Sequence, residues 1–357
     1  MISVLIVEDS PVMQEFLLRI LGSDPQIYVM GIASNGEEAI AAVARKKPDV
    51  ITMDINMPKM DGLEATGRIM ETNPVPIVIV SGNWNPREVE TTFRAMEAGA
   101  VAIVQKPAGF GHPEHQKTAD ELRCTVKLMS EVKVVRRWAH HRQKAGAVEQ
   151  KLMTAPEKTA EIKVISIGAS TGGPVAIQTI LSLLRKEFQI PLLIVQHIAK
   201  GFLSGMVDWL SETSAVTVKI AVNGEHIEPG QAYFAPDGFN MGVGGRGEIF
   251  LSDSGYVNAV RPSASYLFRS VAELYGANAA GVILTGMGRD GAEELRLMKA
   301  KGAITIVQDK ESSVVFGMPG AAIELDAATY VLSPDKIAEA LVMLSDDKIN
   351  NIVRKRA

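Results

Sequence analysis

Several features typical of secreted and membrane proteins are missing from this chain of 357 residues. It contains one cysteine, Cys124, which excludes an internal disulfide framework and suits a reducing compartment. No apolar run approaches the roughly 20 residues that a membrane helix needs. Acidic residues at Glu8 and Asp9 arrive without a basic leader, so we expect no secretory signal and a cytoplasmic location.

An excess of positive charge is missing as well. The chain has 37 lysines and arginines against 41 aspartates and glutamates, which gives a formal net charge of -4. No bulk attraction to nucleic acid or to an anionic membrane is therefore expected, and we predict neither nucleic-acid binding nor direct membrane insertion. The histidines lack cysteine partners at the spacing of zinc ligands.

What the chain does have is a regular alternation of short apolar runs with helical patterns. The alternation falls into two blocks, 1–135 and 161–350, and the length is comfortable for two domains. Each block is predicted to be an α/β domain with a doubly wound, mostly parallel sheet. Glycine-rich turns within 231–251 predict a β-hairpin. The expected strands are 3–7, 28–33, 50–53, 76–80, 102–104, 163–168, 192–196, 216–222, 281–285 and 304–308, and the expected helices are 11–21, 36–44, 113–135, 174–184, 263–275 and 291–301.

The stretch between the two blocks has a different composition. Within 136–151, arginines and lysines crowd around one acid, Glu149, and no apolar periodicity survives. We interpret 136–160 as a linker that forms a solvated tether, with docking of this stretch on a domain face as the alternative.

Chemically distinctive residues stand at the ends of strands in the first block. Glu8, Asp9, Asp54, Ser81 and Lys106 follow four separate strands. In an open parallel sheet, the carboxyl ends of the strands border the ligand crevice beside the point where strand order reverses. Carboxylates gathered there need a compensating charge, and Mg²⁺ favours carboxylates together with phosphate oxygens and waters.

These five residues predict a phosphoryl-transfer site. Asp54 is expected to be the nucleophile that accepts the phosphoryl group, with Glu8, Asp9 and Asp54 holding Mg²⁺. Ser81 and Lys106 are placed to contact the phosphoryl oxygens. For any one of these residues the alternative is a solvated polar cap on a strand end, and it is their joint occurrence that favours a site.

The same segments resemble the receiver domain of two-component response regulators. The matching letters are VEDS at 7–10, MDINMPKMDG at 53–62, SG at 81–82 and KP at 106–107. The resemblance covers about 1–125 and implies a flavodoxin-like fold. It also implies phosphorylation of Asp54 by a partner histidine kinase and a switch coupled through Ser81.

A second set of residues surrounds a strand-to-helix turn in the second block. Ser170 follows the strand 163–168 and precedes the helix 174–184, within a segment that fits G-x-S-x-G. Glycines at 168, 172 and 173 let the backbone turn sharply. Such a turn can present a nucleophile, but it can also cradle a phosphate or be a turn and nothing more.

Two further strand ends favour the nucleophile. His197 follows the strand 192–196, and Asp290 follows the strand 281–285. Serine, histidine and aspartate at three strand ends of one sheet predict a catalytic triad. The chain order Ser…His…Asp differs from the Ser…Asp…His order of α/β-hydrolases and disfavours that superfamily.

The second block resembles the catalytic domain of chemotaxis protein-glutamate methylesterases. The segments are IGASTGGP at 167–174, QHI at 196–198, GEHIEPGQAYFAP at 224–236, RPS at 261–263, LTGMGRDGA at 284–292 and VVFGMP at 314–319. The resemblance implies a Rossmann-like three-layer domain in which Ser170 is the nucleophile, His197 the general base and Asp290 its orienting partner. Thr171 and Met287 are implied at the oxyanion hole or the rim.

This resemblance also implies an activity. Members of the family remove methyl groups from glutamate γ-methyl esters of chemoreceptors, releasing methanol, and some deamidate receptor glutamines. We therefore expect a phosphorylation-regulated serine hydrolase that needs Mg²⁺ at the receiver and no cofactor at the esterase site. The expected partners are a histidine kinase of a chemotaxis-type pathway and methylated chemoreceptors.

Two other functions stay open at this point. The chain departs from the common family pattern at Val260, at Ala264-Ser265 and at Gly320, which motivates a second domain that binds a partner without turnover, although the intact set of Ser170, His197 and Asp290 argues against it. The other alternative is a phosphate- or nucleotide-binding domain, although the turn around Ser170 lacks both G-x-G-x-x-G and a Walker lysine.

Overall fold

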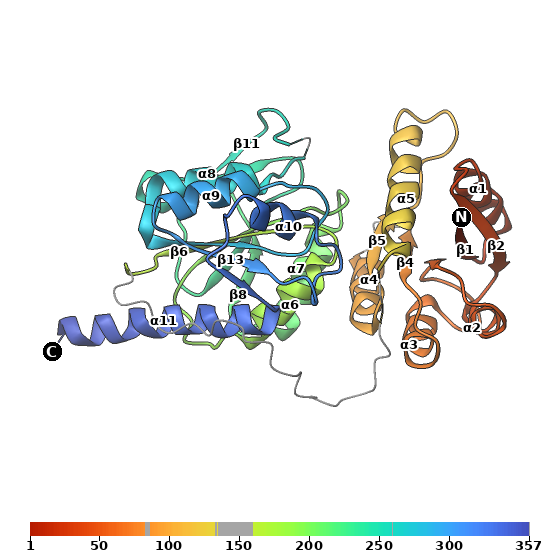
Figure 1. Ribbon diagram of the computed structural model, residues 1–357, viewed down its shortest axis with the longest axis horizontal. Helices are drawn as coiled ribbons and strands as arrows, with labels where there is room; N and C mark the ends of the chain where they lie inside the picture. Colours follow the sequence, from red (N-terminus) through yellow and green to blue (C-terminus); the bar gives the residue numbers. More distant parts are fainter. Residues whose placement is uncertain (83–85, 133, 135–159, 259, 357) are drawn as a thin grey trace. The chain divides into compact units, whose positions relative to one another are not determined.

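The chain folds into two compact α/β units, Met1–Lys144 and Ala145–Ala357, in a computed structural model (Figure 1). The structure describes residues 1–82, 86–132, 134, 160–258 and 260–356, and for 86–90 and 347–356 it describes the backbone alone. All of the predicted linker except Ala160 lies outside the described residues, so its boundaries stay a prediction. We describe each unit by itself.

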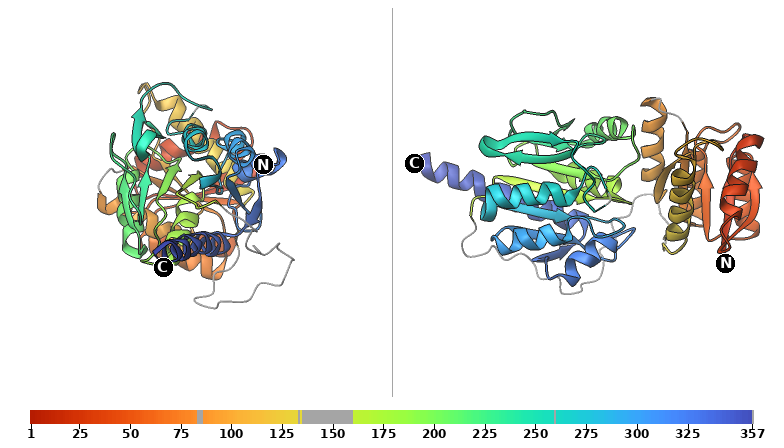
Figure 2. Two further views of the ribbon diagram at one scale, coloured as in Figure 1. Left: turned by 90° about the vertical axis from the view of Figure 1, so that its left-hand side faces the viewer. Right: turned by 90° about the horizontal axis from the view of Figure 1, so that it is seen from above.

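The first unit is a five-stranded parallel sheet in the order β2-β1-β3-β4-β5. Helices α1 and α5 pack against each other on one face, and α2, α3 and α4 form a layer on the other (Figures 1 and 2). The strand order reverses between β1 and β3, which predicts a site at their carboxyl ends. The elements are β1 (Ile2–Val7), α1 (Pro11–Gly22), β2 (Ile27–Ala33), α2 (Gly36–Arg45), β3 (Val50–Met53), α3 (Gly62–Thr72), β4 (Ile77–Ser81), α4 (Pro86–Ala98), β5 (Ala102–Gln105) and α5 (His115–Ser130).

Short polar caps start the helices of this unit soon after the preceding strands or loops. The side chains of Ser10, Asn35 and Asp61 accept hydrogen bonds from the backbone N–H three residues further on. Each cap satisfies an N–H that the helix itself leaves unpaired. The cap at Ser10 directly follows Glu8 and Asp9, so α1 begins immediately after the acidic end of β1.

The second unit contains a seven-stranded parallel sheet in the order β14-β13-β12-β6-β7-β9-β8. Helices α6, α7 and α11 form the layer on one face, and α8, α9 and α10 form the layer on the other. The order reverses between β6 and β12. The strands are β6 (Val164–Ala169), β7 (Leu192–Gln196), β8 (Thr217–Ile220), β9 (Gln231–Phe234), β12 (Ala279–Ile283), β13 (Ile304–Gln308) and β14 (Tyr330–Leu332), and the helices are α6 (Gly173–Leu183), α7 (Leu203–Thr213), α8 (Ala264–Tyr275), α9 (Ala292–Ala300), α10 (Gly317–Glu324) and α11 (Pro334–Arg356).

The fold class predicted from the sequence is confirmed for both units, but the hairpin is shorter than expected. The antiparallel pair is β10 (Asn240–Gly244) with β11 (Glu248–Ser252), joined by the 3-10 turn η1 (Gly245–Gly247). The first part of the predicted range, β9, pairs in parallel with β7 and β8 instead. Consecutive side chains at Ala232, Tyr233 and Phe234 are all buried, which is the pattern of a sheet interior covered on both faces.

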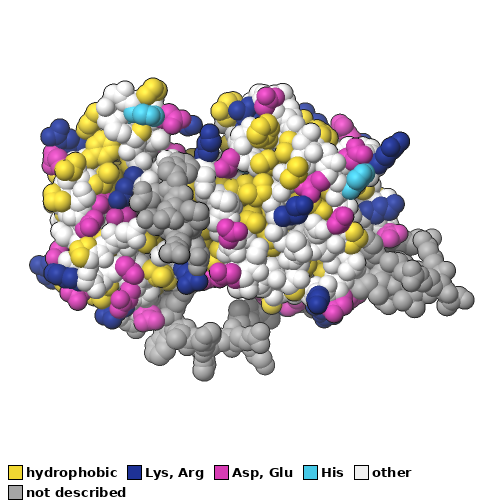
Figure 3. All heavy atoms as spheres, turned by 180° about the vertical axis from the view of Figure 1, so that it is seen from behind, with side chains coloured by type: hydrophobic (Ala, Val, Ile, Leu, Met, Phe, Trp, Pro, Cys, Tyr) yellow, Lys and Arg dark blue, Asp and Glu magenta, His cyan; other side chains and the backbone are white. Residues whose placement is uncertain are grey.

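Other boundaries differ as well. Helix α5 ends at Ser130, earlier than the expected helix over 113–135. Strand β14 and helices α3, α4, α7, α10 and α11 lie outside the elements expected from the sequence, as does the 3-10 turn η2 (Gly276–Asn278). Within the described ranges, no helix is both long enough and apolar enough to cross a membrane. Acidic and basic side chains are interspersed on the visible face of both units (Figure 3).

A close approach of α8 to β6 shapes the second unit. A Cβ added at Gly168 of β6 would lie 2.7 Å from the Cβ of Ala264, the first residue of α8. The ring of Phe268, one turn further along α8, is fully buried in the same core cluster. The missing side chain at Gly168 therefore lets the amino end of α8 lie directly against the end of β6.

In the first unit, two glycines of α3 give a matched test of how closely this helix packs against the chain after β3. A Cβ at Gly62 would lie 2.1 Å from the backbone oxygen of Asp54, whereas nothing lies within 4 Å of a Cβ at Gly67. We expect Gly62→Ala to lower the free energy of unfolding of the first unit by about 1–3 kcal/mol through overpacking. Gly67→Ala should raise it by about 0.5–1 kcal/mol, because alanine favours a helix interior. Urea unfolding of both variants measures the difference, and equal effects would contradict the packing argument.

Candidate active sites

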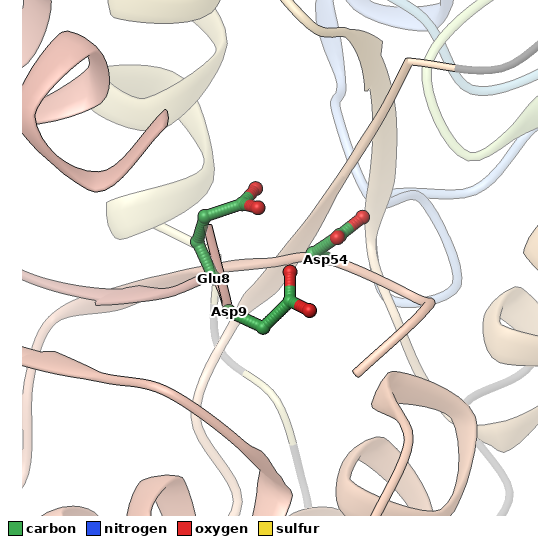
Figure 4. A group of neighbouring side chains, drawn as sticks. All are labelled: Glu8, Asp9 and Asp54. Atoms are coloured by element: carbon green, nitrogen blue, oxygen red, sulfur yellow. The ribbon is translucent and has the colours of Figure 1, made fainter. Parts of the chain in front are cut away.

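An acidic cluster forms at the carboxyl ends of β1 and β3, where the first sheet reverses its strand order. Glu8 and Asp9 follow β1, Asp54 follows β3, and ligand atoms of the three carboxylates lie within 4.8 Å of one another (Figure 4). The N–H of Asp54 donates to the carbonyl of Val7 at 2.9 Å, which holds the two strand ends side by side. Glu8 and Asp54 are buried, and Asp9 is exposed.

Lys106 reaches this cluster from the end of β5. Its Nζ lies 2.8 Å from Glu8 Oε2 and 3.1 Å from Asp54 Oδ2. Its backbone N–H donates to the carbonyl of Ser81, the last residue of β4, at 2.8 Å. The structure thus brings together Glu8, Asp9, Asp54 and Lys106 and places buried Ser81 on the strand beside Lys106.

The electrostatics of the cluster are incompletely balanced. Burial raises the pKa of Glu8 and of Asp54 above their usual values, and the neighbouring Lys106 ammonium offsets only part of this effect. Burial opposes the charged form of Lys106 as well, but contacts with Glu8 and Asp54 raise its pKa overall. Among the side chains that the structure describes, three carboxylates gather near one ammonium, that of Lys106. An all-oxygen donor set with surplus negative charge fits a hard divalent cation.

The turn that carries Ser170 lies at the carboxyl end of β6. The N–H of Ser170 donates to the carbonyl of Thr285 at 3.0 Å, and the carbonyl of Ser170 accepts from the N–H of Gly173 at 2.8 Å. Gly172 has a φ of +79°, and a Cβ there would lie 2.6 Å from Val314. Only glycine fits this position, because an L side chain would be strained at that φ and would also clash.

Thr285 ties the Ser170 turn to the neighbouring strand end. Its hydroxyl donates to the carbonyl of Thr171 at 2.9 Å and accepts from the N–H of Val315 at 2.9 Å. Its own N–H donates to the side-chain oxygen of Gln308 at 2.8 Å. Because Thr285 follows β12, these bonds fix the turn after β6 against the loop that leads to Asp290.

His197 stands at the end of β7, the strand that pairs with β6 on its other side. Its N–H donates to the carbonyl of Ala169 at 2.9 Å, and the buried Gln196 amide donates to the carbonyls of Ser170 and His197 at 2.8 and 2.7 Å. One glutamine side chain therefore joins the two strand ends that carry the serine and the histidine.

The imidazole of His197 is held by Asp290. Its Nε2 lies 3.0 Å from Asp290 Oδ2. An ionised carboxylate can only accept a hydrogen bond, so Nε2 donates to it, and Nδ1 is the ring nitrogen left to take a proton from a partner. No hydrogen bond joins Ser170 Oγ to the His197 ring among the residues that the structure describes, and such bonds often tighten only once substrate is bound.

Asp290 is surrounded by hydrogen-bond donors. Burial opposes its ionisation, but the hydrogen bond from His197 and those from Asn258 and Ser263 outweigh burial and hold the pKa of Asp290 well below its usual range. The backbone N–H of Ala264 also donates to Oδ2 at 2.6 Å. Asp290 is therefore an anion at neutral pH although its side chain is almost fully buried.

Two backbone N–H groups lie free beside the serine turn. In the described part of the chain, the N–H groups of Thr171 and Met287 have no hydrogen-bond partner, whereas that of Ser170 is taken by Thr285. The Met287 side chain is 50% exposed, which places this residue at the surface of the loop before Asp290. These two groups are free to donate to an oxyanion.

Comparison with known proteins identifies both units. Residues 165–341 match the family described as CheB methylesterase, and residues 4–113 match the response regulator receiver domain. A protein-glutamate methylesterase/protein-glutamine glutaminase of Nitrosospira multiformis is 56% identical over 344 residues, 96% of this chain and 97% of the relative. This chain belongs to the methylesterase family.

Further relatives agree with this assignment. The corresponding methylesterase/glutaminase of Syntrophus aciditrophicus is 53% identical over 97% of this chain and 99% of the relative. The crystal structure of the Thermotoga maritima CheB methylesterase catalytic domain is 41% identical, covers 52% of this chain and 100% of that domain, and has a TM-score of 0.50. The family resemblance expected from the sequence is confirmed, and the turn around Ser170 belongs to a methylesterase domain.

The methylesterase unit contains functional contacts that the sequence reasoning missed. Gln196, Asn258, Ser263 and Thr285 each contact a candidate catalytic residue or the turn that carries it. Gln196 and Ser263 lie within segments that support the family resemblance, QHI and RPS. Ser263 is also the N-cap of α8, a position at which serine is favoured. Asn258 lies in a loop, and nothing local in the sequence signals its contact with Asp290.

The depressed pKa of Asp290 predicts a pH-dependent stability. The folded-state pKa lies below the unfolded value of about 3.9, so ionised Asp290 stabilises the fold above that value and loses this contribution as the pH falls. We expect Asp290→Asn to lower the free energy of unfolding by about 3 kcal/mol at pH 7, because the groups that donate hydrogen bonds to Asp290 would lose their charged acceptor. The gap from wild type should begin to shrink below about pH 5. Denaturant unfolding between pH 7 and pH 3 measures it, with exposed Asp253→Asn as the control, and a gap that widens on acidification would contradict the assignment.

Proposed function

We propose that the second unit removes methyl groups from glutamate γ-methyl esters of chemoreceptors and releases methanol. The observation that carries this proposal is the His197–Asp290 pair at 3.0 Å, standing at a strand end next to the Ser170 turn. A buried anion, an oriented imidazole and a serine at a tight turn are the parts of an acyl-transfer site.

The geometry supports a two-step reaction. His197 takes the proton of the Ser170 hydroxyl through Nδ1 while Oγ attacks the ester carbonyl, and Asp290 stabilises the imidazolium that forms. The N–H groups of Thr171 and Met287 donate to the oxyanion. The tetrahedral intermediate collapses as His197 returns the proton to the leaving oxygen, which departs as methanol. Water then attacks the acyl-enzyme by the same route, and glutamate is released with Ser170 regenerated.

The same site serves deamidation of receptor glutamines. A side-chain amide offers the same carbonyl carbon, and its leaving nitrogen takes the proton from His197 and departs as ammonia. The acyl-enzyme is identical to that formed from the methyl ester, so hydrolysis again yields glutamate. In both reactions Ser170, His197 and Asp290 supply the nucleophile, the base and the charge stabilisation, so this proposal includes no cofactor at the esterase site.

We propose that the first unit is a receiver that a histidine kinase of a chemotaxis-type pathway phosphorylates on Asp54. Its all-carboxylate cluster supports Mg²⁺ as the cation held by Glu8, Asp9 and Asp54, and Mg²⁺ would supply charge neutralisation for the incoming phosphoryl oxygens. Lys106 is placed to exchange its contacts with Glu8 and Asp54 for phosphoryl oxygens, and Ser81 flanks it. In this proposal, phosphorylation raises the esterase activity, and the protein acts in the cytoplasm.

The esterase proposal predicts a total dependence on Ser170. Ser170→Ala and His197→Ala should each lower kcat for methanol release by at least about 10⁴-fold, because triad members act as a unit. Neither variant should change the unfolding midpoint enough to explain this loss. Methanol release from methylated receptor measures it, and Ser182→Ala, an exposed serine of α6, is the matched control. Unchanged turnover in Ser170→Ala would end the esterase assignment.

The receiver proposal predicts that Asp54 and a divalent cation are both required for phosphorylation. Incubation with acetyl phosphate and Mg²⁺ should add one phosphoryl group to the wild type and raise methanol release, and both effects should vanish in Asp54→Asn or after removal of Mg²⁺ with EDTA. Asp120→Asn, at an exposed aspartate of α5, should behave as wild type. Intact-mass spectrometry follows the phosphoryl group, and labelling that persists in Asp54→Asn would place the acceptor elsewhere.

A further inference from the structure

The carboxylate of Asp290 receives hydrogen bonds from an unusual variety of sources. Oδ2 accepts from His197 Nε2 at 3.0 Å and from the N–H of Ala264 at 2.6 Å. Oδ1 accepts from the Ser263 hydroxyl at 2.8 Å, from Asn258 Nδ2 at 3.0 Å and from the N–H of Ser265 at 3.2 Å. An ionised carboxylate offers about four lone-pair positions, so every one is occupied.

The amino end of α8 supplies the buried part of this arrangement. The N–H groups of Ala264 and Ser265 belong to its first turn and have no partner within the helix. One contacts each oxygen of Asp290, so together they set the plane of the carboxylate. The amino end of a helix also favours a negative charge, which adds to the hydrogen bonds.

Asn258 closes the arrangement from the solvent side. Its Nδ2 donates to Asp290 Oδ1 and also to Ser265 Oγ at 2.9 Å, and Ser265 Oγ accepts from the N–H of Gly291 at 2.9 Å. Because the ionised carboxylate can only accept, the amide must present its nitrogen to Asp290, and its orientation is fixed. Asn258 is exposed, whereas Ser263 and Ser265 are buried.

The local backbone conformation positions the Asn258 side chain. Val257 and Val260 exchange two backbone hydrogen bonds, at 3.2 and 3.0 Å, and Asn258 lies inside the turn that they close. Its φ is +51°, in the left-handed region that asparagine tolerates better than most residues. This turn presents the Asn258 amide to Asp290, where its nitrogen donates to Oδ1 and to Ser265 Oγ.

We infer that Asn258 is a positioning residue for catalysis, acting through the carboxylate of Asp290. With its donor in place, Oδ1 is held by Asn258, Ser263 and Ser265, and Oδ2 is left to Ala264 and His197. Without it, Oδ1 keeps its Ser263 and Ser265 donors but is open to water on the solvent side, which weakens the hold on the carboxylate that faces the imidazole. This inference rests on the proposed acyl-transfer function, because it assigns Asn258 a role in orienting His197.

A comparison of two substitutions separates hydrogen bonding from space filling. Asn258→Ala removes the donor and should lower kcat for methanol release by about tenfold with KM unchanged within about twofold. Asn258→Asp keeps the shape but turns a carboxylate toward Asp290, so it should be the more damaging change, about 100-fold in kcat. Asn223→Ala is the matched control, an exposed asparagine that accepts from the N–H of Leu251 on the hairpin, and it should behave as wild type.

The outcomes separate the inference from the proposed function. If the wild type releases methanol and Asn258→Ala matches it, or if Asn258→Asp is the milder change, the positioning role is wrong while the esterase assignment stands. If the wild type releases none, the proposed function fails, and a stability cycle still decides whether Asn258 holds Asp290. Unfolding free energies of Asn258→Ala, Asp290→Asn and the double variant should then be non-additive, and additive losses would overturn the contact.

Discussion

Each unit depends on a carboxylate that is withdrawn from water at the end of its sheet. Asp54 and Asp290 are both buried aspartates, and each lies where the strand order of a parallel sheet reverses. Burial disfavours the charged form of a carboxylate unless donors or cations replace the lost water. The arrangement of residues around each aspartate is therefore a response to the same constraint, and the two responses differ.

Around Asp290 the compensation is complete, and around Asp54 it is partial. Asp290 accepts five hydrogen bonds, one of them from His197, and its pKa lies below the usual range. Asp54 accepts from the N–H of Ile55 and shares one ammonium, Lys106, with Glu8, and its pKa is raised. A permanently ionised carboxylate suits a residue that orients a histidine throughout a reaction. A carboxylate with unbalanced charge nearby suits a site that gains and loses a cation and a phosphoryl group.

The sequence predicted the strand-end residues because a strand end can be found from local pattern. Apolar runs locate the strands, and the residues that follow the parallel strands of one sheet must then meet at one edge of it, as Ser170 and His197 do in the second unit. The contacts of Asn258 and Thr285 could not be found in this way, because they depend on a loop and a turn brought together by tertiary packing. Strand β9 was misassigned to a hairpin for a related reason, since glycine-rich turns nearby carry a stronger local signal than burial on both faces.

Packing far from the chemistry sets the geometry of the Asp290 contacts. The amino end of α8 can donate to Asp290 only if the helix lies directly against β6 and against the turn after Asp290. Two glycines allow this approach, because a Cβ at Gly168 would lie 2.7 Å, and one at Gly291 3.2 Å, from the Cβ of Ala264. A side chain at either position would push Ala264 and its N–H away from the carboxylate, by a few tenths of an ångström or more. The orientation of His197 thus depends on core residues that contact neither its imidazole nor Ser170.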